Sequence, residues 1–246
     1  MANLYPLSTK WKFIFFYDAA ATMLWFCCLA RFLILLPLVG RRFLPGGIAD
    51  FFHGISLIPL IGFFFNKLLL EPSFSLKDIW GYTNGIKMAW ICYGVIFPHP
   101  KIAKHTSYSF LILSYCVGNL IHYSYYTFKT KTRASPRFLF WLEFSNFYLI
   151  YPISLLAEMI LIFLSLEFVL EDSIYDYLLK FVLLAYVPIA YFTWGYLKRR
   201  RQVKYVEVIE KRERIKNSVA NERTQPAATT AIPSIPEEIE LREVNN

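Results

Sequence analysis

A succession of six long apolar stretches constrains this chain more than any other feature. They run over about residues 13–39, 49–65, 79–97, 108–128, 138–166 and 177–197. Most are long enough to cross a bilayer as a helix, which takes about 20 apolar residues. The second and third are marginal, because glycine, proline or charged residues interrupt them. Soluble helices would carry charged faces at helical spacing, and these stretches have almost none. The sequence therefore predicts an all-α polytopic membrane bundle of six transmembrane helices.

The composition changes at Lys198, where charged residues become frequent. The whole chain is 56% hydrophobic and 18% charged, yet much of that charge lies in its last part. We therefore expect a membrane domain over residues 1–197 and a cytosolic tail over 198–246. Within the tail, residues 203–223 have a short amphipathic pattern, and 224–240 combine three prolines with Ala and Thr. This composition predicts that the tail is partly disordered.

The positive charges of the short loops predict the orientation. If both termini are cytosolic, most loop cations lie on the cytosolic side, as the positive-inside rule requires. They are Lys10, Lys12, Lys67, Lys77, Lys129, Lys131, Arg133, Arg137 and the run Lys198–Arg201. Arg41 and Arg42 oppose this orientation weakly. Because the basic residues are juxtamembrane, nucleic-acid binding is disfavoured.

The four cysteines, Cys27, Cys28, Cys92 and Cys116, all fall inside apolar stretches. This placement predicts buried thiols rather than the disulfide framework of a small secreted domain. None has the spacing of a metal ligand, so we expect no metal site. No cysteine has an arginine six residues later, as cysteine phosphatases require, so we set phosphatase activity aside.

Ionisable residues inside the stretches are functional candidates, because charge is costly in lipid. They are Asp18, Arg31, Asp50, His53, Lys87, His122, Glu143, Glu158 and Lys180. For most of them an interhelical hydrogen bond or a reach to the interface is the simpler role. Glu158 stands out, since Tyr151 lies seven residues before it on the same helix face, with Pro152 between them. A phenol and a carboxylate beside one cleft would suit acid/base chemistry, although a buried Tyr–Glu hydrogen bond fits equally well.

The segment from Tyr151 to Glu158 resembles the Tyr-Pro-x-Gly-x-x-x-Glu signature of the 3-hydroxyacyl-CoA dehydratases, also called protein-tyrosine-phosphatase-like proteins. Further segments resemble family motifs in the right order: Tyr17-Asp18 with Trp25, Asp50 to His53, Asn119 to Tyr126, and Tyr186 with Pro188. The likeness covers about residues 13–201. Asn119 and His122 stand where the family has Glu and Arg, Glu143 where it has Arg, and Ser154 where it has Gly.

This resemblance implies dehydration of a very-long-chain (3R)-3-hydroxyacyl-CoA to the trans-2-enoyl-CoA, the third step of fatty-acid elongation in the endoplasmic reticulum membrane. It implies Tyr151 and Glu158 as the acid/base pair, with His53, His122, Asp18 and Asn119 as possible supporting residues. The basic segment Lys129, Lys131, Arg133 and Arg137 would face the CoA group. No cofactor is implied; membrane lipids and other elongation enzymes are the implied partners.

Two other functions remain open from the sequence. The substitutions at Asn119, His122, Glu143 and Ser154 favour a catalytically inactive paralogue that acts as a membrane scaffold or regulator of the elongase complex. A small transporter is the weaker alternative, because the chain has neither internal repeats nor broken helices in matching halves.

Overall fold

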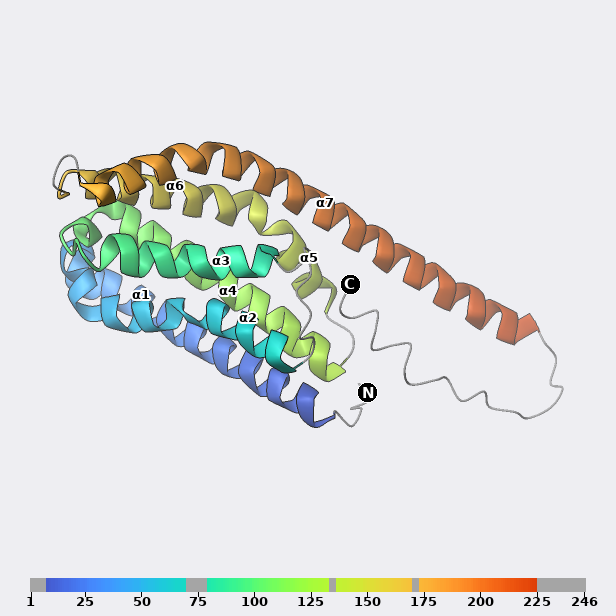
Figure 1. Ribbon diagram of the computed structural model, residues 1–246. Helices are drawn as coiled ribbons and strands as arrows, with labels where there is room; N and C mark the ends of the chain where they lie inside the picture. Colours follow the sequence, from blue (N-terminus) through green and yellow to red (C-terminus); the bar gives the residue numbers. More distant parts are fainter. Residues whose placement is uncertain (1–7, 70–78, 133–135, 170–172, 225–246) are drawn as a thin grey trace. The chain divides into compact units, whose positions relative to one another are not determined.

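The computed structural model describes residues 8–69, 79–132, 136–169 and 173–224, and the regular structure in these ranges is helical (Figure 1). The α-helices are α1 (Thr9–Ser56), α2 (Ile58–Leu69), α3 (Ile79–Ala89), α4 (Thr106–Thr132), α5 (Arg137–Ser145), α6 (Phe147–Leu166) and α7 (Ile174–Thr224). A π-helical segment, η2 (Trp90–Ile96), continues α3, and a short 3₁₀ turn, η3 (Ile102–Lys104), precedes α4. The predicted all-α fold class is confirmed.

Helix α1 consists of two limbs joined at Gly40, whose φ of 71° is in the region that favours glycine. The limbs run in opposite directions (Figure 1), and a methyl group added at Gly47 would lie 3.0 Å from the Leu35 side chain of the first limb. The second limb and α2 together form an apolar helical segment from Phe43 to Phe65. This segment starts six residues before the predicted second stretch, because Pro45, Gly46 and Gly47 lie within the helix rather than before it.

The junction of α1 and α2 explains why the second stretch looked interrupted. A turn at Leu57 separates the two helices, and Pro59 lacks the N–H that would continue the backbone ladder. The Tyr17 hydroxyl donates a 2.5 Å hydrogen bond to the Ile58 carbonyl oxygen beside this turn. Gly62 makes room for that phenol, since a methyl group there would lie 2.7 Å from the Tyr17 oxygen.

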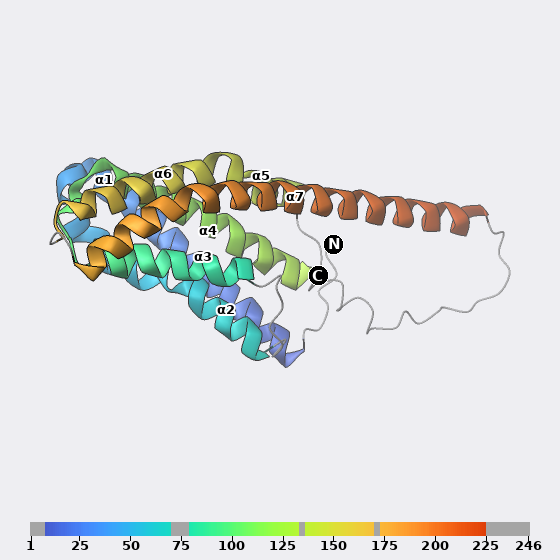
Figure 2. The same ribbon diagram turned by 45° about the horizontal axis from the view of Figure 1, so that its top comes forward.

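In the described part of the chain, four segments are long and apolar enough to cross a membrane: Thr9–Arg41, Phe43–Phe65, Arg137–Leu166 and Ile174–Lys211. The other two predicted stretches correspond to α3 with η2 and to α4, which carry more polar residues. Helix α4 has 27 residues and is about 40 Å long at the usual helical rise, so length does not prevent it from spanning. It packs most extensively on α1 and α6 (Figure 2). The count of six membrane spans therefore stays a prediction.

The chain divides into two compact units, residues 1–201 and 202–246. Helix α7 crosses the boundary and continues to Thr224. The disorder predicted for the end of the tail mostly concerns residues 225–246, which lie outside the described residues.

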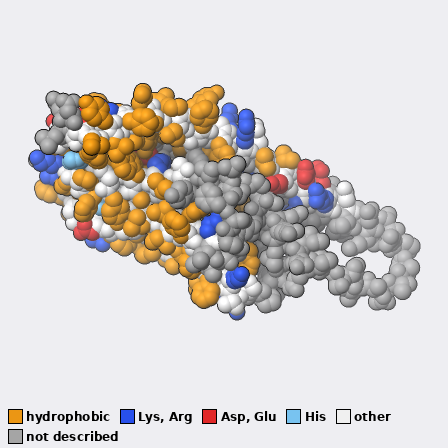
Figure 3. Space-filling model, in the orientation of Figure 1, with side chains coloured by type: hydrophobic (Ala, Val, Ile, Leu, Met, Phe, Trp, Pro, Cys, Tyr) orange, Lys and Arg blue, Asp and Glu red, His pale blue; other side chains and the backbone are white. Residues whose placement is uncertain are grey.

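Many large apolar side chains of the first unit are exposed, as expected for a body immersed in lipid. Large side chains such as Phe181, Leu184 and Phe192 are 68%, 75% and 73% exposed. Figure 3 shows hydrophobic side chains over much of the visible helix surface, with many of the charged ones toward the helix ends. The four cysteines are free, and three of them are buried.

Candidate active site

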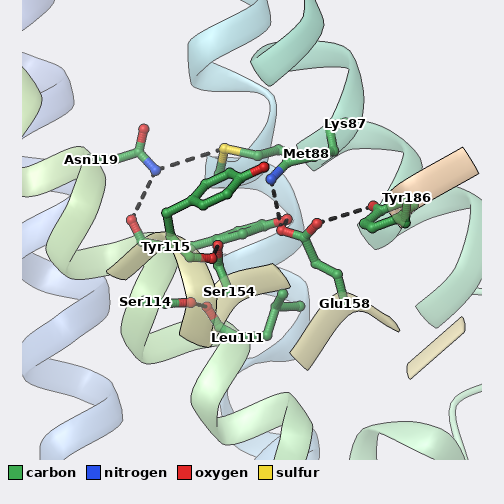
Figure 4. A network of polar contacts seen from close by, with 10 residues as sticks. Lys87, Met88, Leu111, Ser114, Tyr115, Asn119, Ser154, Glu158 and Tyr186 are labelled. Atoms are coloured by element: carbon green, nitrogen blue, oxygen red, sulfur yellow. Dashed lines mark hydrogen bonds and ion pairs between the residues drawn. The ribbon is translucent and has the colours of Figure 1, made fainter. Parts of the chain in front are cut away.

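The carboxylate of Glu158 forms the centre of a buried polar cluster between four helices. Glu158 lies on α6 and has no exposed surface. Its Oε1 accepts hydrogen bonds from Lys87 Nζ at 2.9 Å and from the Tyr115 hydroxyl at 2.8 Å. Its Oε2 accepts one from the Tyr186 hydroxyl at 3.0 Å (Figure 4). The donors come from α3, α4 and α7, so a single side chain connects four elements of the bundle.

Lys87 supplies the positive charge that makes this burial tolerable. An isolated carboxylate is very costly in a low-dielectric interior, and an ion pair with further hydrogen bonds offsets that cost. The Lys87 ammonium also lies over the Tyr115 ring, 5.9 Å from its centroid. Its side chain is 25% exposed, unlike the carboxylate. Lys87 is therefore the member of the cluster with room to move.

The helical repeat of α6 directs Glu158 inward. The buried side of this helix includes Ser154, Ala157, Glu158, Leu161 and Ile162, at the three- and four-residue spacing of one helix face. The hydroxyl of Ser154 donates to the backbone oxygen of Tyr151 on its own helix, so it adds no contact to the carboxylate.

Tyr151 lies apart from the Glu158 cluster. Its side chain is half-buried, with its ring 6.3 Å from that of Trp194 on α7, and it interacts with the neighbouring Thr193 of the same helix. It is close enough to Glu158 for an electrostatic interaction, but within the described part of the chain no direct hydrogen bond joins the two side chains. The two predicted acid/base residues thus share α6 and both meet α7, while their polar atoms have different partners.

Three of the four predicted supporting residues occupy different places. Asn119 is next to the cluster, since its Nδ2 donates to the Tyr115 backbone oxygen at 2.8 Å and contacts the Met88 sulfur at 3.7 Å. Asp18 is buried on α1. His53 is buried among aromatic rings, with the Tyr93 ring 5.9 Å away, and its Nε2 has no hydrogen-bond partner among the described residues. Of these three residues, Asn119 is the one that contacts a member of the Glu158 cluster, through the backbone oxygen of Tyr115.

His122 belongs to a second polar cluster, nearer the end of the bundle where α5 begins. Its Nδ1 lies 3.0 Å from Oε1 of the buried Glu143, and its ring contacts that of Tyr126 with centroids 4.7 Å apart. Arg200 of α7 lies 3.8 Å from the same Glu143 oxygen and 3.5 Å from the Tyr126 hydroxyl. Two of the residues that depart from the family pattern, His122 and Glu143, are therefore paired with each other.

Cations of the predicted CoA-side segment lie against aromatic rings. Lys129 lies over the rings of Tyr125 and Tyr126, at 5.8 and 5.9 Å from their centroids, and Lys131 lies 5.6 Å from that of Phe15. Arg137 begins α5, and Arg133 is outside the described residues. Cation–π contacts of this kind keep a charge near the membrane interface.

Three residues of the Glu158 cluster were not assigned a role from the sequence. Lys87 was recognised as an ionisable residue within a span, but its partner on a helix 71 positions away has no sequence signature. Tyr186 was noted only as part of a motif, and Tyr115 gave no signal among 17 tyrosines. In the described residues, no group of three or more His, Cys, Asp or Glu side chains has a geometry that could hold a metal ion.

Comparison with known proteins gives this arrangement a family context. Residues 86–207 match the sequence model of the family described as protein tyrosine phosphatase-like protein, PTPLA. The β-1,6-glucan synthesis-associated protein KEG1 of Saccharomyces cerevisiae is 34% identical over 185 residues, which cover 71% of this chain and 88% of that protein. The chain belongs to the PTPLA family.

Other relatives in this family have names that state an activity. The chain is 28% identical over 87 residues to the very-long-chain (3R)-3-hydroxyacyl-CoA dehydratase PASTICCINO 2 of Arabidopsis thaliana, covering 35% of this chain and 39% of that one. It is 26% identical over 148 residues to very-long-chain (3R)-3-hydroxyacyl-CoA dehydratase 1 of Mus musculus, covering 53% and 50%. The chain thus spans half or less of the length of these two dehydratases, as a divergent member of their family. No solved structure matches it significantly.

Proposed function

We propose that this PTPLA-family chain dehydrates a very-long-chain (3R)-3-hydroxyacyl-CoA to the trans-2-enoyl-CoA. The observation that carries the proposal is the Glu158 carboxylate, which is fully buried and contacted by one ammonium and two phenols. A positioned carboxylate in a water-poor site is the kind of base that can remove a proton alpha to a thioester. The dehydratase names of several relatives support the same reaction class.

The proposed chemistry moves one proton in a closed cycle. Glu158 takes the α proton, the bond between the β carbon and its oxygen breaks, and the leaving hydroxyl receives a proton from Tyr151 to become water. The Tyr151 phenolate then recovers its proton from Glu158. Lys87 first holds the carboxylate ionised, and because it is partly exposed it can turn toward the thioester oxygen when substrate enters. Tyr115 and Tyr186 keep the carboxylate oriented.

The setting of this reaction is also a proposal. The acyl chain would lie between apolar helices, and the CoA phosphates would meet Lys129, Lys131, Arg133 and Arg137. The bundle would span the endoplasmic reticulum membrane six times with both termini cytosolic, near other enzymes of the elongation cycle. The apolar helices and the cations at the interface support this setting.

The test is a direct activity assay on the purified full chain. The protein in lipid nanodiscs would be given a 3-hydroxyacyl-CoA, and enoyl-CoA would be measured by chromatography. We expect product from the wild type and a loss of at least about a hundredfold in Glu158→Gln and Tyr151→Phe, the usual scale of general acid–base catalysis. Tyr148→Phe is the matched control, since this tyrosine lies one turn from Tyr151 but bonds Arg201. Equal product from wild type and Glu158→Gln would refute the proposed reaction.

A second candidate function is that of a non-catalytic membrane scaffold, and one observation favours it. Both oxygens of Glu158 already have donors and the side chain is fully buried, as in a polar clamp that holds four elements together. Such a scaffold would serve the elongase complex or, as the name of the yeast relative KEG1 suggests, β-1,6-glucan synthesis.

Complementation separates the two candidate functions. Expression in a dehydratase-deficient yeast strain should restore growth if the chain is an enzyme, and Glu158→Gln should fail to do so at equal protein level. A scaffold would give no rescue. If the chain is a scaffold, its depletion from its own cells should instead change the β-1,6-glucan content or the assembly of the elongase complex. Expression of the Glu158→Gln variant at equal protein level should then reverse that change.

A further inference from the structure

The two groups that exchange a proton in the proposed dehydration lie apart in the bundle. Tyr151 precedes Glu158 by seven residues, which corresponds to about 10 Å along the axis of α6. Within the described residues, no hydrogen bond joins the two side chains. Each turnover would leave a proton on Glu158 and remove one from Tyr151. The cycle therefore needs a third group that carries the proton back.

Tyr186 of α7 lies where such a group is needed. Its hydroxyl donates to Oε2 of Glu158 at 3.0 Å, and Figure 4 shows it on the side of the carboxylate away from Lys87. The residue is only 6% exposed, so bulk water has little access to it. It is also close enough to Tyr151 for an electrostatic interaction. A phenol can accept one proton on its oxygen while its own O–H donates another, as a proton relay requires.

The packing of α6 against α7 places Tyr186 beside both proton-exchanging groups. The two helices run in opposite directions (Figure 1), so positions that rise along one helix fall along the other. Glu158 accordingly meets Tyr186, and Tyr151 meets Trp194, eight positions further along α7. A hydroxyacyl group between these two levels would have its α hydrogen at Glu158 and its β hydroxyl at Tyr151.

The other phenol of the cluster, Tyr115, has no such position. Its hydroxyl donates to Oε1 of Glu158, the oxygen that Lys87 also contacts. In the described part of the chain, Tyr151 is not among its electrostatic neighbours. Tyr115 therefore makes the same kind of bond to the carboxylate as Tyr186 but has no path to Tyr151.

We propose that Tyr186 relays the proton from Glu158 back to Tyr151 after each turnover, an inference that rests on the proposed dehydration. After the carbon–oxygen bond breaks, Glu158 is protonated, Tyr151 is a phenolate and the expelled water lies beside it. The carboxyl proton passes to the Tyr186 oxygen, the former Tyr186 proton passes to this water, and a proton of the water passes to Tyr151. One proton thus moves from carboxyl to phenolate, and the water leaves with its composition unchanged.

The test compares the first turnover with the later ones. The full chain in lipid nanodiscs would be mixed rapidly with a 3-hydroxyacyl-CoA, and enoyl-CoA per protein molecule would be followed by quenched flow. The measured quantity is the ratio of the first-turnover rate to the steady-state rate. We expect Tyr186→Phe to raise this ratio at least about tenfold over the wild type, because base and acid are ready for one turnover but are then reset slowly. An unchanged ratio would overturn the relay.

Tyr115→Phe is the matched variant, because it also removes one phenol donor from the Glu158 carboxylate. A loss of orientation should slow its first turnover and its steady state alike, so its ratio should stay at the wild-type value. If Tyr115→Phe raises the ratio as much as Tyr186→Phe does, the two phenols only orient the carboxylate and the relay is wrong. Tyr186→Met also lacks the hydroxyl and replaces Tyr186→Phe if that variant does not fold.

The same experiment separates failure of the relay from failure of the dehydration. A wild type that forms no enoyl-CoA even in the first turnover would overturn the proposed reaction, and the relay with it. A wild type that forms enoyl-CoA, together with a Tyr186→Phe variant of unchanged ratio, would overturn the relay alone.

Discussion

The ion pair between Lys87 and Glu158 predicts a large coupling free energy between two helices that are distant in sequence. Lys87→Met would leave a fully buried carboxylate with two phenol donors and no counter-charge. Loss of one partner from a buried pair costs about 3–5 kcal/mol, and the 25% exposure of Lys87 favours the lower end. Glu158→Gln leaves the Lys87 ammonium without a counter-charge and one of the two phenols without a suitable acceptor. We expect this variant to lower the free energy of unfolding by about 2–3 kcal/mol. In the double variant both charges are gone, so the total cost should also be about 2–3 kcal/mol, well below the sum of the two single costs.

The measurement is a double-mutant cycle on the free energy of unfolding. Wild type, both single variants and the double variant would be titrated with SDS in dodecylmaltoside micelles and followed by tryptophan fluorescence. We expect a coupling of about 2–3 kcal/mol. Lys204 with Glu207, a 2.7 Å pair on successive turns of α7, is the control and should give about 0.5 kcal/mol or less. A coupling that small for Lys87 and Glu158 would refute the buried pair and, with it, the orientation of Glu158 on which both candidate functions rest.

Three further substitutions test the packing of the bundle by the same titration. Gly85→Ala should lower the free energy of unfolding by about 1–3 kcal/mol, because its new methyl group would lie 2.9 Å from the Leu60 Cα. The control Gly195→Ala meets no atom within 4 Å and should be neutral or stabilising. Equal effects of the two substitutions would contradict the close contact of α2 with α3. Gly40→Ala should cost about 1–3 kcal/mol because the positive φ of 71° is unfavourable for an L side chain, and an unchanged unfolding midpoint would argue against this backbone conformation. Tyr186→Phe should cost about 1–3 kcal/mol by removing one donor from the carboxylate, and no change would place its hydroxyl elsewhere.

The helical class of this fold was accessible from the sequence because a helix is the simplest way to satisfy every backbone group inside lipid. The limits of the stretches were less accessible. Pro45, Gly46 and Gly47 indicate a loop by composition, yet they lie inside the second limb of α1. The chain reverses direction at Gly40 alone, so residues that would break a helix elsewhere are tolerated near its start, where fewer backbone hydrogen bonds are lost.

The candidate site shows a similar division between what spacing predicts and what packing decides. The apolar residues around Glu158 on α6 predict that its carboxylate points inward. A buried carboxylate in turn requires a buried partner. The identity of the partners does not follow, because Lys87 and Tyr115 lie 71 and 43 positions away and their contact depends on how α3 and α4 pack. Tyr151 illustrates the opposite case: its seven-residue spacing from Glu158 is on one face, but Thr193 and Trp194 supply its contacts.

The pairing of His122 with Glu143 changes how the departures from the dehydratase pattern are understood. Considered separately along the sequence, each substitution removes a positive charge. In space they meet at 3.0 Å, with Arg200 close to the same carboxylate. The two substitutions therefore act as one exchange at a contact between α4 and α5, so variants at these positions should be made in pairs.

The reversal of α1 at Gly40 has a consequence for how the chain enters a membrane. Almost no loop separates the two apolar segments that meet between Arg41 and Phe43. If both limbs span the membrane, we expect them to enter it together as a hairpin, and the start of α1 and the end of α2 would then lie on the same side of the bilayer. A reporter or glycosylation acceptor inserted at the tip of this hairpin would then disturb the insertion step that it was meant to map.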